Sequence, residues 1–206
     1  MKLGDLSPRD LRDLLAGNTL VLRTGPFATR IHSPMPGIAD GLLRLYPGFP
    51  LDDGDFCDFH VRVGPPTGIR RWLKPQINFW HDGHSPFKPL PANHAFALLE
   101  WGLNWCVAGH AHHYLMLHAA VLEKNGRAVV LPGDPGAGKS TLTAALMLSG
   151  WRLLSDEITL IDRDDGLIVG LARPVSLKNA SIDVIRHAFP DAIIGAPAHD
   201  THKGTV

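Results

Sequence analysis

Eight consecutive residues carry the clearest chemical signal in this chain, and they run from Gly133 to Ser140. Their sequence, GDPGAGKS, fits the pattern G-x-x-x-x-G-K-[ST] at every position. Glycines allow successive backbone N–H groups to converge on phosphate oxygens, the Lys139 ammonium adds a positive charge, and the Ser140 hydroxyl is a ligand for Mg²⁺. The alternative is an ordinary glycine-rich turn, which has no need for a lysine and a serine after its last glycine. The segment and the residue that follows it are therefore predicted to bind ATP with Mg²⁺: Gly133, Asp134, Pro135, Gly136, Ala137, Gly138, Lys139, Ser140 and Thr141.

Two adjacent acidic residues, Asp156 and Glu157, form the second candidate group, and Asp156 lies 16 positions after Ser140. They follow an expected strand at residues 151–154, and an open α/β sheet builds its sites at the carboxyl ends of its strands. A phosphate-transferring enzyme needs an acid near the metal and a carboxylate that accepts the proton of the acceptor hydroxyl. We predict Asp156 and Glu157 as catalytic residues, and Ser140 with Asp156 as the metal site. A solvated turn after the strand is the alternative.

Further candidates lie among the histidines and the later basic residues. Five residues that are able to bind zinc lie close together in sequence: Cys106, His110, His112, His113 and His118. No second pair recurs at a ligand spacing, and adjacent side chains point in different directions in a helix or a strand, so a polar helix end is favoured over a zinc site. Arg173 and Lys178 flank a turn that could face the phosphates, although a solvated surface is the favoured interpretation. A lone histidine in a strand, such as His118, is usually structural.

The elements around the glycine-rich segment support a phosphate site. An apolar strand at residues 127–131 precedes it, and a helix rich in alanine and leucine follows at 139–148 with its positive N-terminus toward the phosphates. Asn-Gly at 125–126 predicts a hairpin, whose first strand covers 114–122 with His118 at its middle. The remaining elements expected in this part are a largely buried helix from residue 92 and strands at 151–154 and 158–162.

The first 90 residues predict a different kind of structure. Ser7 followed by Pro8 marks a helix start, and Gly17 its end. Expected strands follow at 19–23, 28–32, 56–63, 71–72 and 77–80. Proline, glycine and aspartate are dense from residue 25 to a proline-rich boundary near 89–91. We therefore predict an α/β chain in which a small N-terminal α+β region, 1–90, precedes a P-loop kinase core, 91–206.

Composition excludes several classes of protein. The 206 residues are 45% hydrophobic, which argues against widespread disorder, and 20 basic residues balance 20 acidic ones. A neutral chain lacks the positive field of a general nucleic-acid binder. No apolar run reaches the length of a membrane helix, and the N-terminus does not resemble a secretory signal. We therefore expect a cytoplasmic protein with no nucleic-acid or membrane partner.

The spacing of these motifs resembles the catalytic core of the HPr kinase/phosphorylase family, and more closely the HPr-kinase-related kinase A group. The similarity covers residues 114–162: His118 before a hairpin, then the 133–140 loop, then Gly150-x-Arg152-Leu153-x-Ser155-Asp156-Glu157. It implies a fold akin to phosphoenolpyruvate carboxykinase, with ATP and Mg²⁺ as cofactors and a serine hydroxyl of a small protein as acceptor. It also implies active-site roles for His118, Lys139, Ser140 and Asp156.

Two positions and one missing run depart from the family pattern. Glu157 replaces the second acid of an Asp-Asp pair, Ala119 stands where glycine is usual, and no Arg-Gly-Leu-Gly run follows. Nucleotide binding therefore remains implied, whereas the phosphorylase reaction and HPr as substrate are not. Family members continue beyond the position of Val206, so we expect a C-terminally shortened core.

The predicted function is transfer of the ATP γ-phosphate to a Ser or Thr hydroxyl on a small protein or peptide. The predicted catalytic residues are Asp156, Glu157 and His118, and a homo-oligomer is compatible with this prediction. Two alternatives stay open: an ATP-binding switch or ATPase without phosphate transfer, and a kinase for a small alcohol such as free serine.

Overall fold

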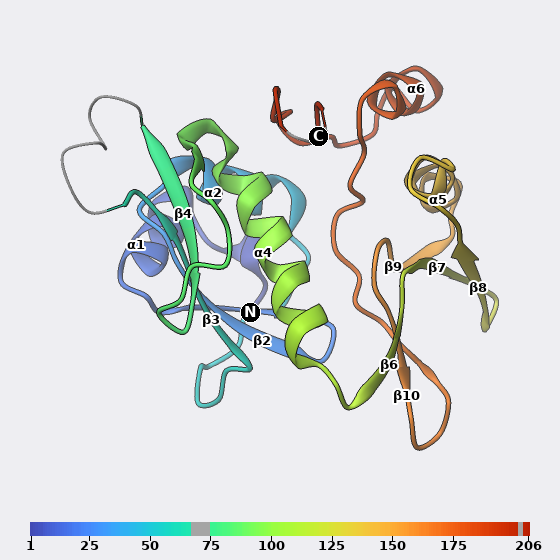
Figure 1. Cartoon of the computed structure of the whole chain (residues 1–206), viewed down its shortest axis with the longest axis horizontal. Helices are drawn as coiled ribbons and strands as arrows, with labels where there is room; N and C mark the ends of the chain where they lie inside the picture. The colour runs from blue at the N-terminus through green and yellow to red at the C-terminus, as the bar shows by residue number, and fades with distance from the viewer. Residues whose placement is uncertain (67–74, 202–203) are drawn as a thin grey trace. The chain divides into compact units, whose positions relative to one another are not determined.

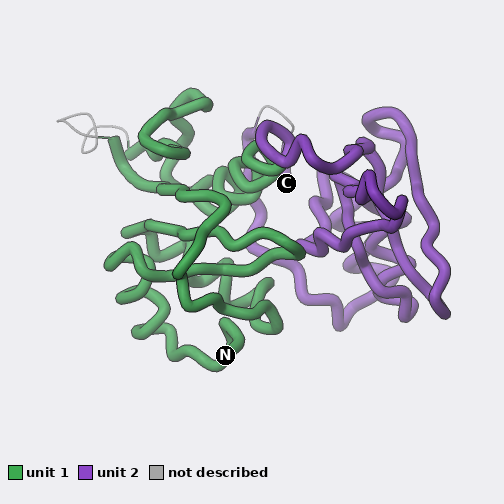
Figure 2. Tube along the Cα trace, turned by 90° about the horizontal axis from the view of Figure 1, so that it is seen from below, with its two compact units in different colours: residues 1–107 green, residues 108–206 purple. Residues whose placement is uncertain are grey.

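The computed structural model describes residues 1–66, 75–201 and 204–206, and its fold is mixed α/β. The chain divides into two compact units, Met1–Val107 and Ala108–Val206, which Figure 2 shows in different colours. Each unit contains its own sheets. None of the helices in the described part of the chain has the length and apolarity needed to cross a membrane.

The sheet of unit 1 has five strands in the order β1-β2-β3-β4-β5. Strands β2 and β3 run parallel, and the other neighbouring pairs run antiparallel. The strand bounds are β1 Leu20–Thr24, β2 Phe27–His32, β3 Phe59–Gly64, β4 Gln76–His81 and β5 Leu90–Pro91. Along β3, Phe59, Val61 and Val63 are buried whereas His60 and Arg62 are exposed. One face of the sheet therefore packs on the core, and the other carries polar side chains.

Most strands predicted for unit 1 are confirmed. The pair expected at 19–23 and 28–32 is the β1–β2 hairpin, in which Leu20 lies opposite Ile31. The strand predicted at 77–80 lies within β4, and the one predicted at 56–63 begins later, at Phe59. The piece predicted at 71–72 lies outside the described residues.

Among the described residues, three α-helices build the core of unit 1 together with the sheet (Figure 1). They are α1 Pro8–Ala16, α2 Pro36–Leu45 and α4 Ala95–His110, and short 3₁₀ helices at Leu3–Asp5 and Ala92–His94 precede α1 and α4. The start of α1 is as predicted, because the Ser7 hydroxyl accepts a hydrogen bond from the Asp10 N–H at 3.1 Å. Leu11 and Leu15, one turn apart on α1, are completely buried.

Helix α4 is the long apolar helix predicted to begin near residue 92. Its Gly102 lies directly against the ring of Phe79 in β4, since a Cβ built on Gly102 would come within 2.0 Å of that ring. Phe79 is itself fully buried. This packing places most of α4 with unit 1, and the division between the units falls at residues 107 and 108 rather than near residue 90.

Unit 2 contains two three-stranded sheets, ordered β8-β7-β9 and β11-β10-β6. Its elements are β6 Tyr114–Leu117, β7 Ala119–Lys124, β8 Arg127–Pro132, α5 Lys139–Leu148, β9 Arg152–Ser155, β10 Thr159–Asp162, β11 Ile168–Val169 and α6 Ala180–Ala188. Helix α5 packs on β7 and β9, and α6 packs on α5. The predicted Asn-Gly hairpin is confirmed: β7 and β8 pair antiparallel, and Asn125 and Gly126 both have positive φ.

The continuous strand predicted for 114–122 is wrong, because the chain bends at His118. Before the bend β6 pairs with β10, and after it β7 pairs with β8 and β9. The ladder with β10 stops at Leu117 opposite Thr159, whose hydroxyl then binds the Ala119 carbonyl at 2.9 Å. Residues 114–122 therefore form two strands because they pair with different strands of unit 2, although their sequence alone predicts one continuous strand.

The contact of α4 with the sheet gives a stability test. Gly102→Ala should lower the free energy of unfolding by about 1–3 kcal/mol, because the buried Phe79 ring has to move to admit a methyl group. Gly109→Ala in the same helix is the matched control, since nothing lies within 4 Å of its added Cβ. Alanine there should be neutral or stabilise by up to about 1 kcal/mol. Denaturant unfolding compares the two, and equal midpoints would contradict this packing.

Candidate functional site

The candidate site lies at one edge of the β8-β7-β9 sheet. Strand β7 pairs antiparallel with both of its neighbours, so β8 and β9 run parallel to each other with β7 between them. The loop at 133–138 follows β8, α5 follows the loop, and Asp156 directly follows β9. Figure 1 shows α5 with strands β7, β8 and β9. Parallel strands end at the same edge, so this crossover brings the start of α5 and the acid together, as the contact between Ser140 and Asp156 shows.

The loop has the backbone conformation that its glycines predict. Gly136 and Gly138 both have φ of +86°, a region that other residues enter only at a cost. Residues 133–138 are exposed, and Lys139, Ser140 and Thr141 form the half-buried first turn of α5. Gly138 is the N-cap, and no side chain caps the helix. The first N–H groups of α5 therefore remain available to an anion at the loop.

The Lys139 ammonium folds back onto the loop that precedes it. It donates to the Gly133 carbonyl and, at 3.1 Å, to the Asp134 carbonyl. The charge thus lies beside the backbone that would surround a phosphate. Lys139 would have to leave these carbonyls in order to pair with a phosphate.

Asp156 is the buried acid of the site, with 8% of its surface exposed. Its Oδ2 accepts hydrogen bonds from the Ser140 hydroxyl at 3.4 Å and from the Ser176 N–H at 2.9 Å. Its Oδ1 is buried and has no hydrogen-bond partner among the described residues. The structure therefore brings together Ser140 and Asp156, the two residues predicted to hold the metal.

The surroundings of Asp156 disfavour its negative charge. Burial raises its pKa from 3.8 to about 6, and the nearby Glu157 carboxylate adds to the increase. The Ser176 N–H, the Ser140 hydroxyl and the Lys178 ammonium act in the opposite direction without cancelling the increase. At neutral pH this carboxylate carries a charge that the protein alone stabilises poorly.

Glu157 and Lys178 form a half-buried ion pair beside Asp156. The Lys178 Nζ lies 3.5 Å from the Glu157 Oε1. From the sequence, Lys178 was expected on a solvated surface, with a position facing the phosphates as the alternative. In the structure it is half-buried and pairs with the Glu157 carboxylate. Arg173 is also half-buried rather than solvated on an open surface.

The contribution of Ser176 was missed at the sequence level. Its backbone N–H, and not its side chain, binds Asp156. A backbone donor exists at every residue except proline, so its role depends only on how the chain is placed. The placement follows from the Leu171 N–H, which binds the Leu154 carbonyl of β9 at 2.7 Å and leads the chain past the acid.

His118 is not brought to the acids by any described contact. It is exposed at the bend between β6 and β7, and within the described residues it has no hydrogen bond or ion pair. Its predicted position in the middle of a strand is wrong. Its active-site role stays a prediction.

The zinc alternative gains no support from the described residues, among which no three His, Cys, Asp or Glu side chains are grouped to hold a metal ion. Cys106 is buried, and the centroids of the His113 and Tyr114 rings lie 4.1 Å apart.

The donor set at Asp156 suits Mg²⁺ in another way. Mg²⁺ prefers oxygen ligands and usually takes only one or two from the protein, with phosphates and water supplying the rest. The Ser140 hydroxyl is an oxygen of this kind, and so is the Asp156 Oδ1, which has no hydrogen bond from the described residues; both lie beside the 133–138 loop.

No family model, curated protein or solved structure matches this chain in the three comparisons with known proteins. The geometry of the residues themselves therefore carries the functional argument.

The raised pKa of Asp156 predicts how stability depends on pH. The carboxyl group of Asp156 has a pKa of about 6 in the folded protein and 3.8 in the unfolded chain, so the folded state holds its proton more tightly. This contributes stability that is fully present below pH 3.8 and is lost as the pH rises through about 6. Asp156→Asn cannot ionise and keeps an oxygen for the Ser176 N–H. At 1.36 kcal/mol per pKa unit, the free energy of unfolding of the variant should exceed that of the wild type by up to about 3 kcal/mol at pH 7, and by less than about 1 kcal/mol at pH 4.

Urea unfolding from pH 4 to pH 8 measures this difference. Asp191→Asn, which removes an exposed carboxylate of the same unit, is the control and should follow the wild-type profile. Parallel profiles for Asp156→Asn and the wild type would show that the buried carboxylate does not oppose folding.

Proposed function

We propose that this chain is an ATP-dependent kinase that transfers the γ-phosphate of Mg²⁺-ATP to a Ser or Thr hydroxyl of a protein or peptide. One observation carries the proposal. The Ser140 hydroxyl at the start of α5 lies 3.4 Å from a buried carboxylate, Asp156, whose second oxygen has no partner within the described residues. A phosphate-type loop thus meets an acid that needs a proton or a cation.

Phosphate binding falls to the loop and to Lys139. The N–H groups from Gly136 to Ser140 would surround the β- and γ-phosphates, and the positive end of α5 would face them. Lys139 would leave the carbonyls of Gly133 and Asp134 and pair with phosphate oxygens.

Ser140 and Asp156 would hold Mg²⁺. When bound, the ion would offset negative charge on the phosphates during transfer. The orphan Oδ1 of Asp156 is the protein atom that gains most from a cation, because it is buried and has no hydrogen bond among the described residues.

Asp156 also suits the transfer of a proton. A base is most effective when its pKa lies near the working pH. Burial brings the pKa of Asp156 to about 6 when no cation is bound, and Mg²⁺ beside its Oδ1 would lower that pKa and keep the carboxylate ionised and able to accept a proton. Asp156 would accept the hydroxyl proton of the acceptor. Glu157, whose Oε1 lies 3.5 Å from the Lys178 Nζ, would assist Asp156 in holding the metal. His118 would position or sense the phosphate, as the resemblance to HPr kinases implies.

The same resemblance supports a protein or peptide as the acceptor and the family of phosphoenolpyruvate carboxykinase-like kinases as the fold. A protein that depends on ATP works where ATP is abundant, so we infer that it acts in the cytoplasm.

The decisive assay offers γ-labelled ATP with Mg²⁺ to the whole chain, together with a Ser/Thr peptide library or with free serine. Label on peptide hydroxyls supports the proposal. Labelled phosphoserine from free serine alone would make the protein a small-alcohol kinase, and ATP cleavage without any labelled acceptor would make it an ATPase or switch.

Nucleotide binding gives a separate prediction. Mg²⁺-ATP at a hundred times its dissociation constant should stabilise the protein by about 2.7 kcal/mol, and Lys139→Ala should remove most of this gain. Lys88→Ala, which changes an exposed lysine outside the site, should keep it. Thermal unfolding with and without nucleotide measures the effect, and an unchanged midpoint for the wild type would refute nucleotide binding.

Removing the base should slow transfer more than it weakens ATP binding, since a base acts in the transition state. Asp156→Asn should lower the transfer rate about 10²–10⁴-fold, which corresponds to an increase of about 3–5 kcal/mol in the activation free energy. Glu157→Gln should lower the rate less. Initial rates and ATP affinities of both variants test this. If affinity falls while the rate at saturation is kept, Asp156 holds the metal only, and equal rates would exclude it from catalysis.

A further inference from the structure

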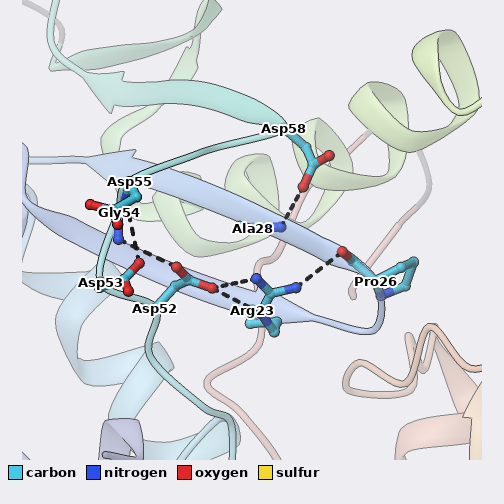
Figure 3. Close-up of polar contacts among 8 residues, drawn as sticks. All are labelled: Arg23, Pro26, Ala28, Asp52, Asp53, Gly54, Asp55 and Asp58. Carbon is cyan, nitrogen blue, oxygen red and sulfur yellow. Dashed lines mark hydrogen bonds and ion pairs between the residues drawn. The ribbon is translucent and has the colours of Figure 1, made fainter.

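The polar face of the unit 1 sheet differs between its two halves. Over β1 and β2 this face is covered by an acidic segment, residues 52–58, which has neither helix nor strand (Figure 3). Over β3 and β4 the same face carries His60, Arg62 and Trp80, and His32 at the end of β2 adjoins them. We call these four residues the open basic face.

The acidic segment shows how the covered half satisfies its polar groups. The Asp52 carboxylate pairs with the Arg23 guanidinium, and the Asp58 carboxylate accepts the Ala28 N–H at 2.7 Å (Figure 3). The hydrogen bond from Arg23 holds the pKa of Asp52 below its ordinary value. One carboxylate of this irregular segment therefore pairs with an arginine of the face, and another binds a backbone N–H of β2.

A backbone oxygen contributes to the same cover. The Arg30 Nη2 donates to the Gly54 carbonyl at 2.8 Å, so the segment reaches the second strand of the sheet. His60, which lies opposite Arg30 in the parallel ladder between β2 and β3, is exposed.

On the open basic face His60 and Arg62 are exposed and His32 and Trp80 half-buried, and no carboxylate of the described residues pairs with Arg62. Arg62 lies opposite His32 in one ladder and opposite Trp80 in the next, and its guanidinium stacks over the Trp80 ring at 4.8 Å. Arg62 is exposed and has no ion pair among the described residues. Burial and the charge of Arg62 lower the pKa of His32, which places the two side chains close together.

We propose that the open basic face binds an acidic, irregular segment of a partner protein. Charge complementarity specifies the occupant, since the protein already places a segment of this chemistry on the other half of the same sheet face. The stacked Arg62 and Trp80 offer a flat surface on which a carboxylate and its backbone can pack.

A protein segment fits better than a nucleic acid. The chain has no net charge, so it lacks the broad positive field that phosphate backbones need. The contacts in the covered half use single carboxylates and one backbone carbonyl, which a peptide supplies. This inference concerns unit 1 alone and does not depend on the proposed kinase activity.

The test measures binding of a labelled peptide to the full chain by fluorescence anisotropy without nucleotide. The probe, LDDGDFSD, copies residues 51–58 with serine in place of Cys57. The control peptide, LNNGNFSN, has the same size without the charges. We expect saturable binding of the acidic peptide that weakens at high salt, and none of the control.

Variants locate the site. Arg62→Glu and Arg62→Ala should each weaken binding, the reversal by at least about tenfold. Arg44→Glu reverses an exposed arginine of α2 and should bind as the wild type does. Circular dichroism confirms that each variant is folded, and if Arg62→Glu is not, Arg62→Ala decides.

Three results would overturn the proposal. They are no saturation by millimolar peptide, equal affinities of the Arg62 variants and the wild type, and binding of a single-stranded oligonucleotide or of anionic vesicles in preference to the acidic peptide.

Discussion

The buried carboxylate of Asp156 is the constraint on which the site in unit 2 depends. Asp156 directly follows β9, and its Oδ2 accepts hydrogen bonds from Ser140 in the first turn of α5 and from Ser176 later in the chain. Its Oδ1 gains no hydrogen bond from the described residues, so the fold accepts a cost that a proton or a cation would remove. A purely structural aspartate would be expected to have both oxygens satisfied or exposed to water.

The loop and the acid are linked by topology rather than by proximity in sequence. Because β7 lies between β8 and β9 and runs opposite to both, the loop after β8 and the acid after β9 reach the same sheet edge. The helix between them, α5, turns its N-terminus toward that edge. Binding groups of three kinds, namely backbone N–H groups, an ammonium and a carboxylate, therefore converge without any long loop.

The sequence was sufficient where a local rule has a unique physical cause. The cap at Ser7, the Asn-Gly hairpin and the 133–140 loop depend on short-range hydrogen bonds and on positive φ, which few residue types supply. The sequence was insufficient where a strand or a side chain is paired with residues that lie far away along the chain. The run 114–122 is apolar without glycine or proline, so nothing local marks the bend at His118. No sequence pattern marks the hydrogen bond from the Ser176 N–H, because every residue except proline has a backbone N–H.

The most direct measurement is a crystal structure of the whole chain with Mg²⁺ and a non-hydrolysable ATP analogue. We expect the β- and γ-phosphates within the 133–140 loop, Lys139 moved from the Gly133 and Asp134 carbonyls onto phosphate oxygens, and the metal beside Ser140 and Asp156. A nucleotide bound elsewhere, or a metal that leaves the Asp156 Oδ1 without a partner, would contradict the proposed site.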